Sequence, residues 1–344
     1  MWWLLACRDP ASGPVDADGD GVPAARDCDD ADPARSPERS EVPGDGIDQD
    51  CDGLDPLAEA TLTGEQADDA FGLRVALVGG KVVVGAPFHG DGAPPAGRVY
   101  VDGVATDGPA GSWFGSGLVP FGDGALVGGP GVGTVRTLDG TVLLDLPGAG
   151  GVIAARGEHW VASTATGAVL DDGTRIEADR RPDALALTAD GTVILGFSHG
   201  DVALRVGDTS VARADDSDEA GYALLLADTD GDGRDSLVVG APGSGKVYTV
   251  DPDALPSALS GGVGPGDGRF GAALAWGDRL WVGAPMAGDE VEGAVYEVGD
   301  SVTRAYTGDV GDQLGASLAA DATNLVVGAP GPASAPGKVR IYAP

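Results

Sequence analysis

Short alternations of apolar and polar residues dominate the chain from residue 57 onward. Runs rich in Val, Leu and Ala are separated by turns such as Gly79-Gly80 and Gly277-Asp278. Alternation with a period of two is typical of strands with one buried face, and paired turn residues are typical of tight hairpins. No helical periodicity is found in this region. The pattern therefore predicts an all-β domain at 57–344.

The predicted strands recur as a repeated unit. A short apolar run ends in Gly-Ala-Pro or Gly-Gly-Pro in five places, and a Phe-Gly pair or its equivalent precedes each of them. The five runs are Val84-Gly85-Ala86-Pro87, Val127-Gly128-Gly129-Pro130, Val239-Gly240-Ala241-Pro242, Val282-Gly283-Ala284-Pro285 and Val327-Gly328-Ala329-Pro330. Four short strands at a period of about 43 residues are typical of a β-propeller blade.

Two degenerate copies fill the long gap between the second and third of these runs. Residues 160–163 and 194–197 carry the apolar run, and Gly167 and Gly200 open the strand that follows. The sequence therefore predicts a seven-bladed propeller of four-stranded blades. Residues 60–64 match residues 304–308, so we expect the first strand to complete the last blade and leave no open sheet edge.

The FG pairs, the Gly-Ala-Pro runs and a following Gly-x-Val-Tyr together resemble the FG-GAP repeats of the integrin α-subunit head. The resemblance implies a propeller in which some blades carry a calcium loop in their first hairpin. Here Asp228, Asp230 and Asp232 match positions 1, 3 and 5 of that loop, the carbonyl of Arg234 matches position 7, and Ser236 stands at position 9, where the family usually has Asp. The alternative is an ordinary Asp-Gly turn.

The same resemblance implies that ligands meet the face opposite the calcium hairpins. The loops after Gly-Ala-Pro are long in copies one, six and seven, which are neighbours once the ring closes. We therefore expect one raised patch for a partner, or else insertion-tolerant loop tips without a function. The patch would carry Phe88, His89 and Met286 as apolar anchors beside Asp91, Asp289 and Glu290.

The segment 8–56 differs in kind, because it is rich in Asp and has almost nothing apolar to fold around. Asp16, Asp18 and Asp20 occupy positions 1, 3 and 5 of an EF-hand-like loop, with Val22 at position 7 and Asp27 at position 12. This spacing aims alternate carboxylates at one centre, which is how calcium is held. Asp27 is shorter than the usual Glu at the closing position. The alternative is a solvated acidic linker.

Residues 16–53 also resemble the metal-binding repeat of copper-associated surface proteins of the MopE type, with Asp-Cys-Asp-Asp and Asp-Gly-Ile-Asp-Gln-Asp-Cys-Asp-Gly as the matching runs. A disulfide between Cys28 and Cys51 would staple the segment. It would also bring Asp45, Asp48, Asp50 and Asp52 towards the first loop as further metal ligands. Copper prefers imidazole and sulfur, whereas this segment has neither His nor Met, so we expect Ca²⁺.

The overall charge supports a cation as partner. The chain has 54 acidic and 21 basic side chains and a formal net charge of -33. Nucleic acids and anionic lipid surfaces are bound through clusters of Lys and Arg, so neither is an expected partner. An acidic surface can also serve solubility alone, and only the spacing of the carboxylates separates the two possibilities.

The first seven residues are apolar and end in Cys7, which resembles a bacterial lipoprotein cleavage box. This resemblance implies that Cys7 is lipidated and that the protein lies outside the cytoplasm, at the cell envelope or outer-membrane surface. Six residues are too few for a complete signal peptide. Either the true start lies further upstream, or Cys7 is an ordinary thiol.

Catalytic motifs are not found in the sequence: His89, His159 and His199 lie in three different copies, and no nucleophile elbow, zinc-binding helix or phosphate loop occurs. We expect a monomeric, non-enzymatic surface module of a bacterium that binds a protein or glycan. The alternative is a secreted propeller hydrolase or lyase acting on polysaccharide. A cluster of carboxylates or a His-carboxylate pair at the axial funnel would favour it.

Overall fold

The computed structural model describes residues 16–37, 39, 58–199, 204–206, 209–255 and 257–343. The chain divides into two compact units, Met1–Ala58 and Glu59–Pro344. The described part of the first unit consists of turns and bends. Among the described residues, no helix is both long and apolar enough to cross a membrane.

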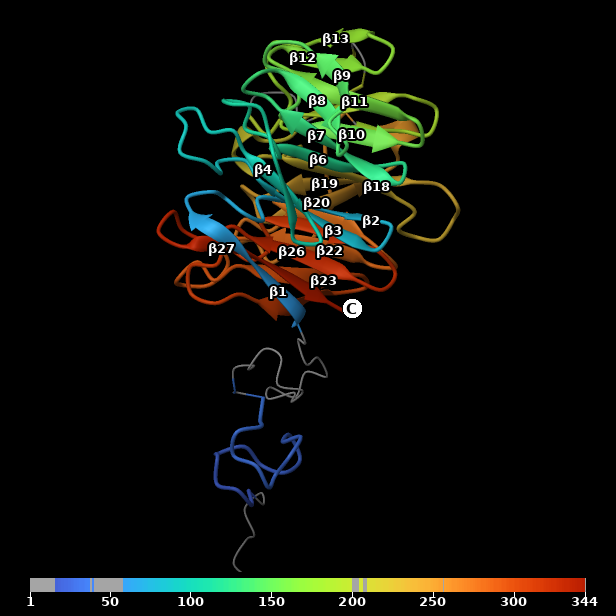
Figure 1. Cartoon of the computed structure of the whole chain (residues 1–344). Helices are drawn as coiled ribbons and strands as arrows, with labels where there is room; N and C mark the ends of the chain where they lie inside the picture. The colour runs from blue at the N-terminus through green and yellow to red at the C-terminus, as the bar shows by residue number, and fades with distance from the viewer. Residues whose placement is uncertain are drawn as a thin grey trace, which may run out of the picture. The chain divides into compact units, whose positions relative to one another are not determined.

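The second unit is a ring of seven antiparallel sheets, and the predicted seven-bladed β-propeller is confirmed (Figure 1). Blade one consists of β2 (Arg74–Val78), β3 (Lys81–Ala86), β4 (Arg98–Val101) and β5 (Val104–Asp107), and blade two of β6 (Gly117–Phe121), β7 (Gly124–Gly129), β8 (Thr134–Thr137) and β9 (Val142–Asp145). Blade three consists of β10 (Ile153–Arg156), β11 (His159–Thr164), β12 (Gly167–Leu170) and β13 (Arg175–Glu177), and blade four of β14 (Ala184–Leu187), β15 (Val193–Gly196), β16 (Leu204–Val206) and β17 (Thr209–Ala212).

The remaining blades complete the ring. Blade five consists of β18 (Ala223–Ala227), β19 (Ser236–Ala241) and β20 (Lys246–Val250), and blade six of β21 (Ala273–Trp276), β22 (Leu280–Ala284), β23 (Ala294–Val298) and β24 (Val302–Thr307). Blade seven consists of β25 (Ser317–Ala320), β26 (Leu325–Ala329), β27 (Pro336–Tyr342) and β1 (Ala58–Ala67). Two short 3₁₀ helices, η1 (Asp216–Asp218) and η2 (Pro252–Ala254), lie in connections.

The ring closes as the sequence predicts, because β1 pairs with β27 and thereby supplies the fourth strand of the last blade. Figure 1 shows the blue N-terminal strand against the red C-terminal strands. The first strand of every other blade and β25 of blade seven contact one another in the cyclic order β2, β6, β10, β14, β18, β21, β25 and back to β2. These seven strands surround the axis of the propeller.

Blade five has an unusual outer edge. Its fourth position is taken by an isolated bridge, in which the amides of Val247 and Val263 each donate to the other residue's carbonyl at 2.9 Å. The surrounding Gly261-Gly262 and Gly264-Pro265 offer few side chains to pack and lack one ladder donor, so a longer strand does not form.

The two degenerate copies are confirmed as blades three and four. Residues 160–163 lie in β11, and residues 194–196 lie in β15. Residues 200–203 lie outside the described part of the chain, and β16 begins at Leu204, later than the expected strand at Gly200.

A repeated hydrogen bond explains why FG and Gly-Ala-Pro recur together. In blade one the amide of Gly72 donates to the carbonyl of Gly85 at 3.1 Å, and Gly271 donates to Gly283 in blade six at the same distance. The bond joins the turn that precedes the first strand to the end of the second strand of the same blade. The FG motif therefore supplies the donor, and the Gly-Ala-Pro motif the acceptor, of one backbone hydrogen bond.

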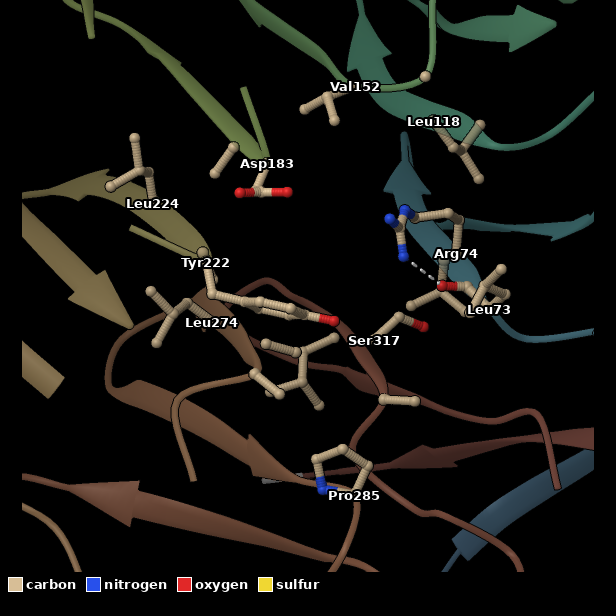
Figure 2. A pocket seen from close by; sticks show the side chains of 18 of the residues that line it. Leu73, Arg74, Leu118, Val152, Asp183, Tyr222, Leu224, Leu274, Pro285 and Ser317 are labelled. Carbon is tan, nitrogen blue, oxygen red and sulfur yellow. Dashed lines mark hydrogen bonds between the residues drawn. The ribbon is translucent and has the colours of Figure 1, made fainter. Parts of the chain in front are cut away.

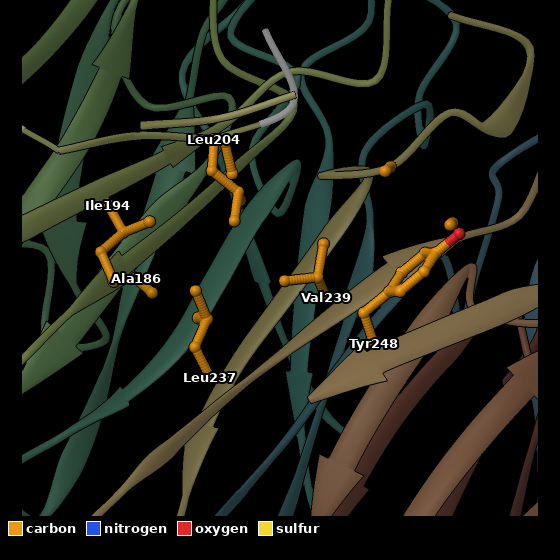
Figure 3. Close-up of a cluster of buried hydrophobic side chains, with 9 residues drawn as sticks. Ala186, Ile194, Leu204, Leu237, Val239 and Tyr248 are labelled. Atoms are coloured by element: carbon orange, nitrogen blue, oxygen red, sulfur yellow. The ribbon is translucent and has the colours of Figure 1, made fainter. Parts of the chain in front are cut away.

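Apolar side chains fill the spaces between neighbouring blades. One cluster joins Ile194 and Leu204 of blade four to Leu237, Val239 and Tyr248 of blade five (Figure 3). Similar clusters join blades one and two, two and three, three and four, five and six, and seven and one. The hydrophobic core is thus divided among the interfaces between sheets, and each blade depends on its neighbours for burial.

Candidate functional site

The first acidic loop gathers the three carboxylates that the sequence places together. Oxygen atoms of Asp16, Asp18 and Asp20 lie within 4.8 Å of one another. Asp16 accepts hydrogen bonds from the amides of Gly19 at 2.7 Å and Gly21 at 3.1 Å. The loop is therefore held in shape by hydrogen bonds to its own aspartate.

The carboxylates of this loop are incompletely satisfied. The Oδ2 atoms of Asp18, Asp20 and Asp27 are buried and have no hydrogen-bond partner within the described residues. Burial raises the pKa of Asp18, and the neighbouring charges of Asp20, Asp27 and Asp16 add to this effect. Unpaired buried oxygens are costly, and one divalent cation would satisfy those of Asp18 and Asp20, which converge with Asp16. Asp27, the predicted closing ligand, is not part of this converging group. This part of the chain therefore fits a bound metal ion.

Residues outside the predicted ligand set hold the loop in place. Asp30 accepts a hydrogen bond from the amide of Ala17 at 2.9 Å, and Arg35 pairs with Asp29 at 3.0 Å. The guanidinium of Arg39 lies 3.8 Å from Asp20 Oδ2. These roles were not predictable from the sequence, because the spacing of an acidic run does not show which carboxylates face the loop. Val22, the predicted donor of the seventh ligand, is buried.

The second acidic loop joins β18 to β19 in blade five, as the sequence predicts. Oxygen atoms of Asp228, Asp230 and Asp232 lie within 4.8 Å of one another. Asp228 accepts hydrogen bonds from the amides of Gly231 at 2.8 Å and Gly233 at 3.0 Å. These bonds have the same spacing along the chain as those of the first loop.

The remaining bonds extend the match. In the first loop Asp18 accepts from the amide of Asp20 at 3.1 Å and Asp20 from that of Val22 at 2.8 Å. In the second loop Asp230 accepts from Asp232 at 3.2 Å and Asp232 from Arg234 at 2.8 Å. Four equivalent bonds therefore shape both loops.

The surroundings of the second loop are more open. Asp230 and Asp232 are exposed, and they line a cavity of about 530 Å³ together with Arg234 and Ser236. Ser236 begins β19 and pairs with Ala227 in the sheet. The cavity is acidic, because Asp190, Asp235, Asp251 and Asp253 also line it.

Asp235 lies next to Ser236 in the second loop and has its partner in another blade. It forms an ion pair with Arg156, which ends β10 in blade three. Asp235 therefore ties the loop to a distant blade, and the sequence contains no signal for this contact.

Other predicted site residues lie outside the described part of the chain. These are Cys7 and Cys51 and the further ligands Asp45, Asp48, Asp50 and Asp52. The lipidation of Cys7 and the pairing of Cys28 with Cys51 stay predictions.

The predicted partner loops lie at the end of the propeller where the second strands finish, here called the GAP face. Phe88 is 49% exposed and Met286 is 46% exposed. Asp91, Asp289 and Glu290 are also exposed. The structure thus leaves these five predicted contact residues accessible.

His89 is a correction to the predicted patch, because it is buried and cannot serve as an exposed anchor. The amide of His89 donates to the carbonyl of Ala86 at 3.1 Å, which closes a turn directly after β3. Its Nδ1 lies 3.7 Å from Asp69 Oδ2. This turn directs the imidazole inward, an orientation that the residue's place in a long loop does not reveal.

The long loops are braced by the next blade. In blade one the carbonyl of Ala96 accepts hydrogen bonds from the Phe114 amide at 2.9 Å and the Ser112 hydroxyl at 2.6 Å. In blade six the carbonyl of Glu292 accepts from the amide of Leu314 at 3.0 Å. The exposed side chains therefore stand on loops whose bases are fixed.

A pocket of about 610 Å³ lies on the axis of the ring and is lined by residues of all seven blades (Figure 2). Met286 and Pro285 line it, so it opens among the loops of the GAP face, whereas Phe88 is outside its lining. Among the described residues, its charged lining consists of Arg74, Arg181, Asp183 and Arg269. This pocket was not predictable from the sequence, because its lining residues are spread over the whole propeller.

The residue before each FG pair has an unusual backbone conformation, and two of these residues line the pocket. Five non-glycine residues have a left-handed backbone at this position, and two of them, Arg269 and Gln313, line the pocket. Their φ angles are 53° for Ala70, 55° for Trp113, 53° for Glu219, 59° for Arg269 and 57° for Gln313. Residues held in this region are uncommon, and the repeat imposes the same conformation on five blades.

Comparison with known proteins supports the two-part organisation. Residues 27–55 match a family model described as "Putative metal-binding motif" of the MopE type, and residues 58–101 match the model of the FG-GAP repeat. No curated protein matches the sequence.

Solved structures with a similar fold include two lyases. Virginiamycin B lyase from Staphylococcus aureus superimposes with a TM-score of 0.58 at 10% identity, covering 83% of this chain and 99% of the lyase. A streptogramin B lyase superimposes with a TM-score of 0.52, also at 10% identity, covering 82% and 97%. At this identity the likeness concerns the fold. The chain thus contains a seven-bladed β-propeller whose residues 58–101 match the FG-GAP repeat, preceded by a segment that matches the MopE-type metal-binding motif.

Proposed function

We propose that the protein is an extracytoplasmic calcium-binding interaction module. Two acidic loops hold Ca²⁺, and the propeller presents its GAP face to a protein or glycan. The observation that carries the calcium part is the shared geometry of the loops: three converging carboxylates and four equivalent backbone hydrogen bonds, in two segments of unrelated fold.

The donor set favours calcium over copper. Both loops offer carboxylate and carbonyl oxygens, and residues 16–53 contain neither His nor Met. Hard cations such as Ca²⁺ accept six to eight oxygen ligands in flexible geometry, whereas copper favours nitrogen and sulfur. We expect affinities of about 10⁻⁴ to 10⁻³ M, which suit an extracellular module.

The proposed location follows from the N-terminal residues. Lipidation at Cys7 would anchor the chain at the cell envelope, and pairing of Cys28 with Cys51 would need an oxidising compartment. Millimolar calcium is available there, which suits loops of modest affinity.

The proposed partner surface rests on exposure and bracing. Phe88 and Met286 follow the Gly-Ala-Pro proline in blades one and six, and both are about half exposed. Apolar side chains rimmed by Asp91, Asp289 and Glu290 resemble the composition of interfaces, with an apolar centre and a polar rim. Fixed loop bases reduce the conformational entropy lost on binding.

A propeller hydrolase or lyase is the alternative. The axial pocket is the observation that supports it, because small-molecule sites are concave and largely preformed. Its described lining contains one carboxylate, Asp183, and lacks histidine. Release of products from polysaccharides by the purified protein would favour the enzyme, and binding without turnover on glycan and surface-protein arrays would favour the interaction module.

Calorimetric titration tests the calcium proposal. The wild-type protein should bind two Ca²⁺ through the two loops, and Asp18→Asn and Asp230→Asn should each remove one of them. Asp123→Asn is the matched control, because Asp123 is exposed in a turn of blade two outside both loops. Tight Cu²⁺ binding without Ca²⁺ binding, or equal Ca²⁺ binding by all four proteins, would refute the proposal.

A further inference from the structure

The axial pocket has the size and construction of a small-molecule site. Its volume of about 610 Å³ lies within the range of roughly 300 to 1,000 Å³ that is usual for such sites. The first strands of all seven blades supply its wall, so its shape is fixed by the closed ring.

The charge of this pocket is opposite to that of the protein. The chain has a formal net charge of -33, yet the charged side chains of the described lining are three arginines and one aspartate. Exposed charges beyond about 8 Å are largely screened at physiological salt, so the arginines dominate the field inside. The pocket should therefore favour an anion.

Arg74 is the arginine of the pocket whose positive charge is not compensated by a carboxylate within the described residues. Its described hydrogen bond goes to a neutral acceptor, the carbonyl of Leu73, at 2.9 Å, and no carboxylate pairs with it within the described residues. Burial lowers the pKa of Arg74. An arginine nevertheless stays protonated in proteins. The Arg74 guanidinium therefore adds a positive charge to the pocket wall, without an anionic partner among the described residues.

The other two arginines differ from Arg74. Arg269 pairs with Glu219 at 2.7 Å and lies 5.2 Å from the centre of the Tyr222 ring, so its charge is compensated. Arg181 donates to the carbonyl of Gly148 at 2.9 Å. This hydrogen bond leaves its positive charge at the rim.

The polar groups of the pocket, Arg74, Tyr222 and Asp183, are separated by a space that is lined by apolar side chains. Figure 2 shows the Tyr222 hydroxyl directed towards the side of the pocket that carries Arg74, while Asp183 lies at another side. Asp183 accepts hydrogen bonds from the Ser198 amide and hydroxyl, both at 2.8 Å, and is thereby held. Leucine side chains line the space between: Leu73, Leu118, Leu224 and Leu274.

We propose that the axial pocket binds an organic anion with one carboxylate or sulfonate and a flat apolar body. The anionic group accepts hydrogen bonds from the Arg74 guanidinium and the Tyr222 hydroxyl, and the body contacts the leucines. Asp183 disfavours a second negative group by repulsion. This site goes beyond the proposed function, because the contacts it rests on, Arg74, Tyr222 and the leucines, belong neither to the calcium loops nor to the partner surface.

Titration with 1-naphthoate tests the proposal, with the neutral 1-naphthamide as matched ligand. The wild-type protein should bind naphthoate more tightly than naphthamide. Arg74→Met should weaken naphthoate binding about tenfold or more, because a charge-assisted hydrogen bond is lost, and should leave naphthamide binding nearly unchanged. Arg175→Met is the control, since Arg175 is exposed on β13, away from the pocket.

Two further variants keep the test valid if Arg74→Met does not fold. Tyr222→Phe and Arg181→Met should each weaken naphthoate binding by a smaller factor at an unchanged melting temperature. Absence of naphthoate binding at millimolar concentration, equal affinity for both ligands, or variants that bind naphthoate as tightly as Arg175→Met does would overturn the proposal. The titrations are run in EDTA as well as in calcium, so a failure of the calcium proposal does not affect the result.

Discussion

The Cα of Gly328 in blade seven stands against the carbonyl oxygen of Gly72 in blade one: a Cβ added to Gly328 would lie 2.0 Å from that oxygen. The same oxygen accepts a hydrogen bond from the Ser317 hydroxyl at 2.8 Å. Equivalent approaches recur between neighbouring blades, as at Gly240 and Gly271. The glycine of Gly-Ala-Pro is therefore required because the next blade's FG turn occupies the place of a side chain.

Gly328→Ala should destabilise the propeller. The added methyl group meets backbone on one side and the Ser317 side chain on the other, and overpacking of this kind costs about 1–3 kcal/mol. Gly299→Ala is the control, since a Cβ at Gly299 meets nothing within 4 Å. Denaturant unfolding followed by tryptophan fluorescence measures both. Equal unfolding midpoints for the two variants would show that blades seven and one accommodate the added methyl group without loss of stability.

Removal of β1 should expose an edge of the ring. A chain beginning at Asp68 lacks the strand that pairs with β27, and open strand edges associate with other chains. Sedimentation should show concentration-dependent oligomers of this chain. A chain beginning at residue 57, which loses only the acidic segment, should remain monomeric. A monomeric, stable chain without β1 would contradict the closure argument.

Acid should weaken an ion-pair network between blades six and seven. Asp309 lies 3.0 Å from Lys338 and 2.7 Å from Arg340. Burial opposes ionisation of Asp309, but the Lys338 hydrogen bond and the charges of Arg340 and Lys338 together lower the pKa of Asp309 below 3.8. Because the pKa of Asp309 is lower in the folded state than in the unfolded chain, its ionised carboxylate stabilises the fold at a pH above the unfolded-state pKa. This stabilisation is lost as the pH falls through the folded-state pKa.

Comparison with Asp309→Asn isolates this effect. The free energy of unfolding of the wild type should fall more steeply below about pH 4 than that of the variant, while both should follow the same course between pH 5 and 8. Urea unfolding at a series of pH values provides the comparison. Parallel curves throughout the acid range would exclude a contribution from Asp309.

Phe88→Ala combined with Met286→Ala should weaken partner binding without changing the melting temperature. Both side chains are about half exposed, so their loss removes little buried area from the fold, whereas exposed anchors of this size contribute roughly tenfold in affinity. Surface plasmon resonance with an array-identified partner measures the change. Val104→Ala is the control, since Val104 is exposed on the outer strand of blade one. Unchanged affinity would place the partner elsewhere.

The fold was predictable because the repeated residues, the glycines above all, are those that the backbone of each blade requires. Gly85 and Gly328 mark close approaches between blades, and such sites tolerate no side chain. The shapes of the two acidic loops were predictable for the same reason, since alternating Asp and Gly fix the turn locally. The sequence also pairs the first strand with the last blade, because residues 60–64 repeat the pattern of residues 304–308.

Features that depend on contacts between distant residues were not predictable. His89 lies in a long loop, yet a turn places it against Asp69 in the interior. The axial pocket draws Arg74 and Tyr222 from different blades, and no local pattern marks either of them. Charge and polarity indicate what a loop can bind, whereas the direction of one side chain depends on its packing.

Hydrogen–deuterium exchange with and without calcium tests the calcium-binding claim most directly. Millimolar Ca²⁺ should slow exchange at residues 16–22 and 228–236 relative to EDTA and raise the melting temperature, because a ligand that binds only the folded state stabilises it. Asp18→Asn should abolish the slowing in the first loop alone, and Asp230→Asn in the second loop alone. Identical exchange in calcium and in EDTA at both loops would contradict the account.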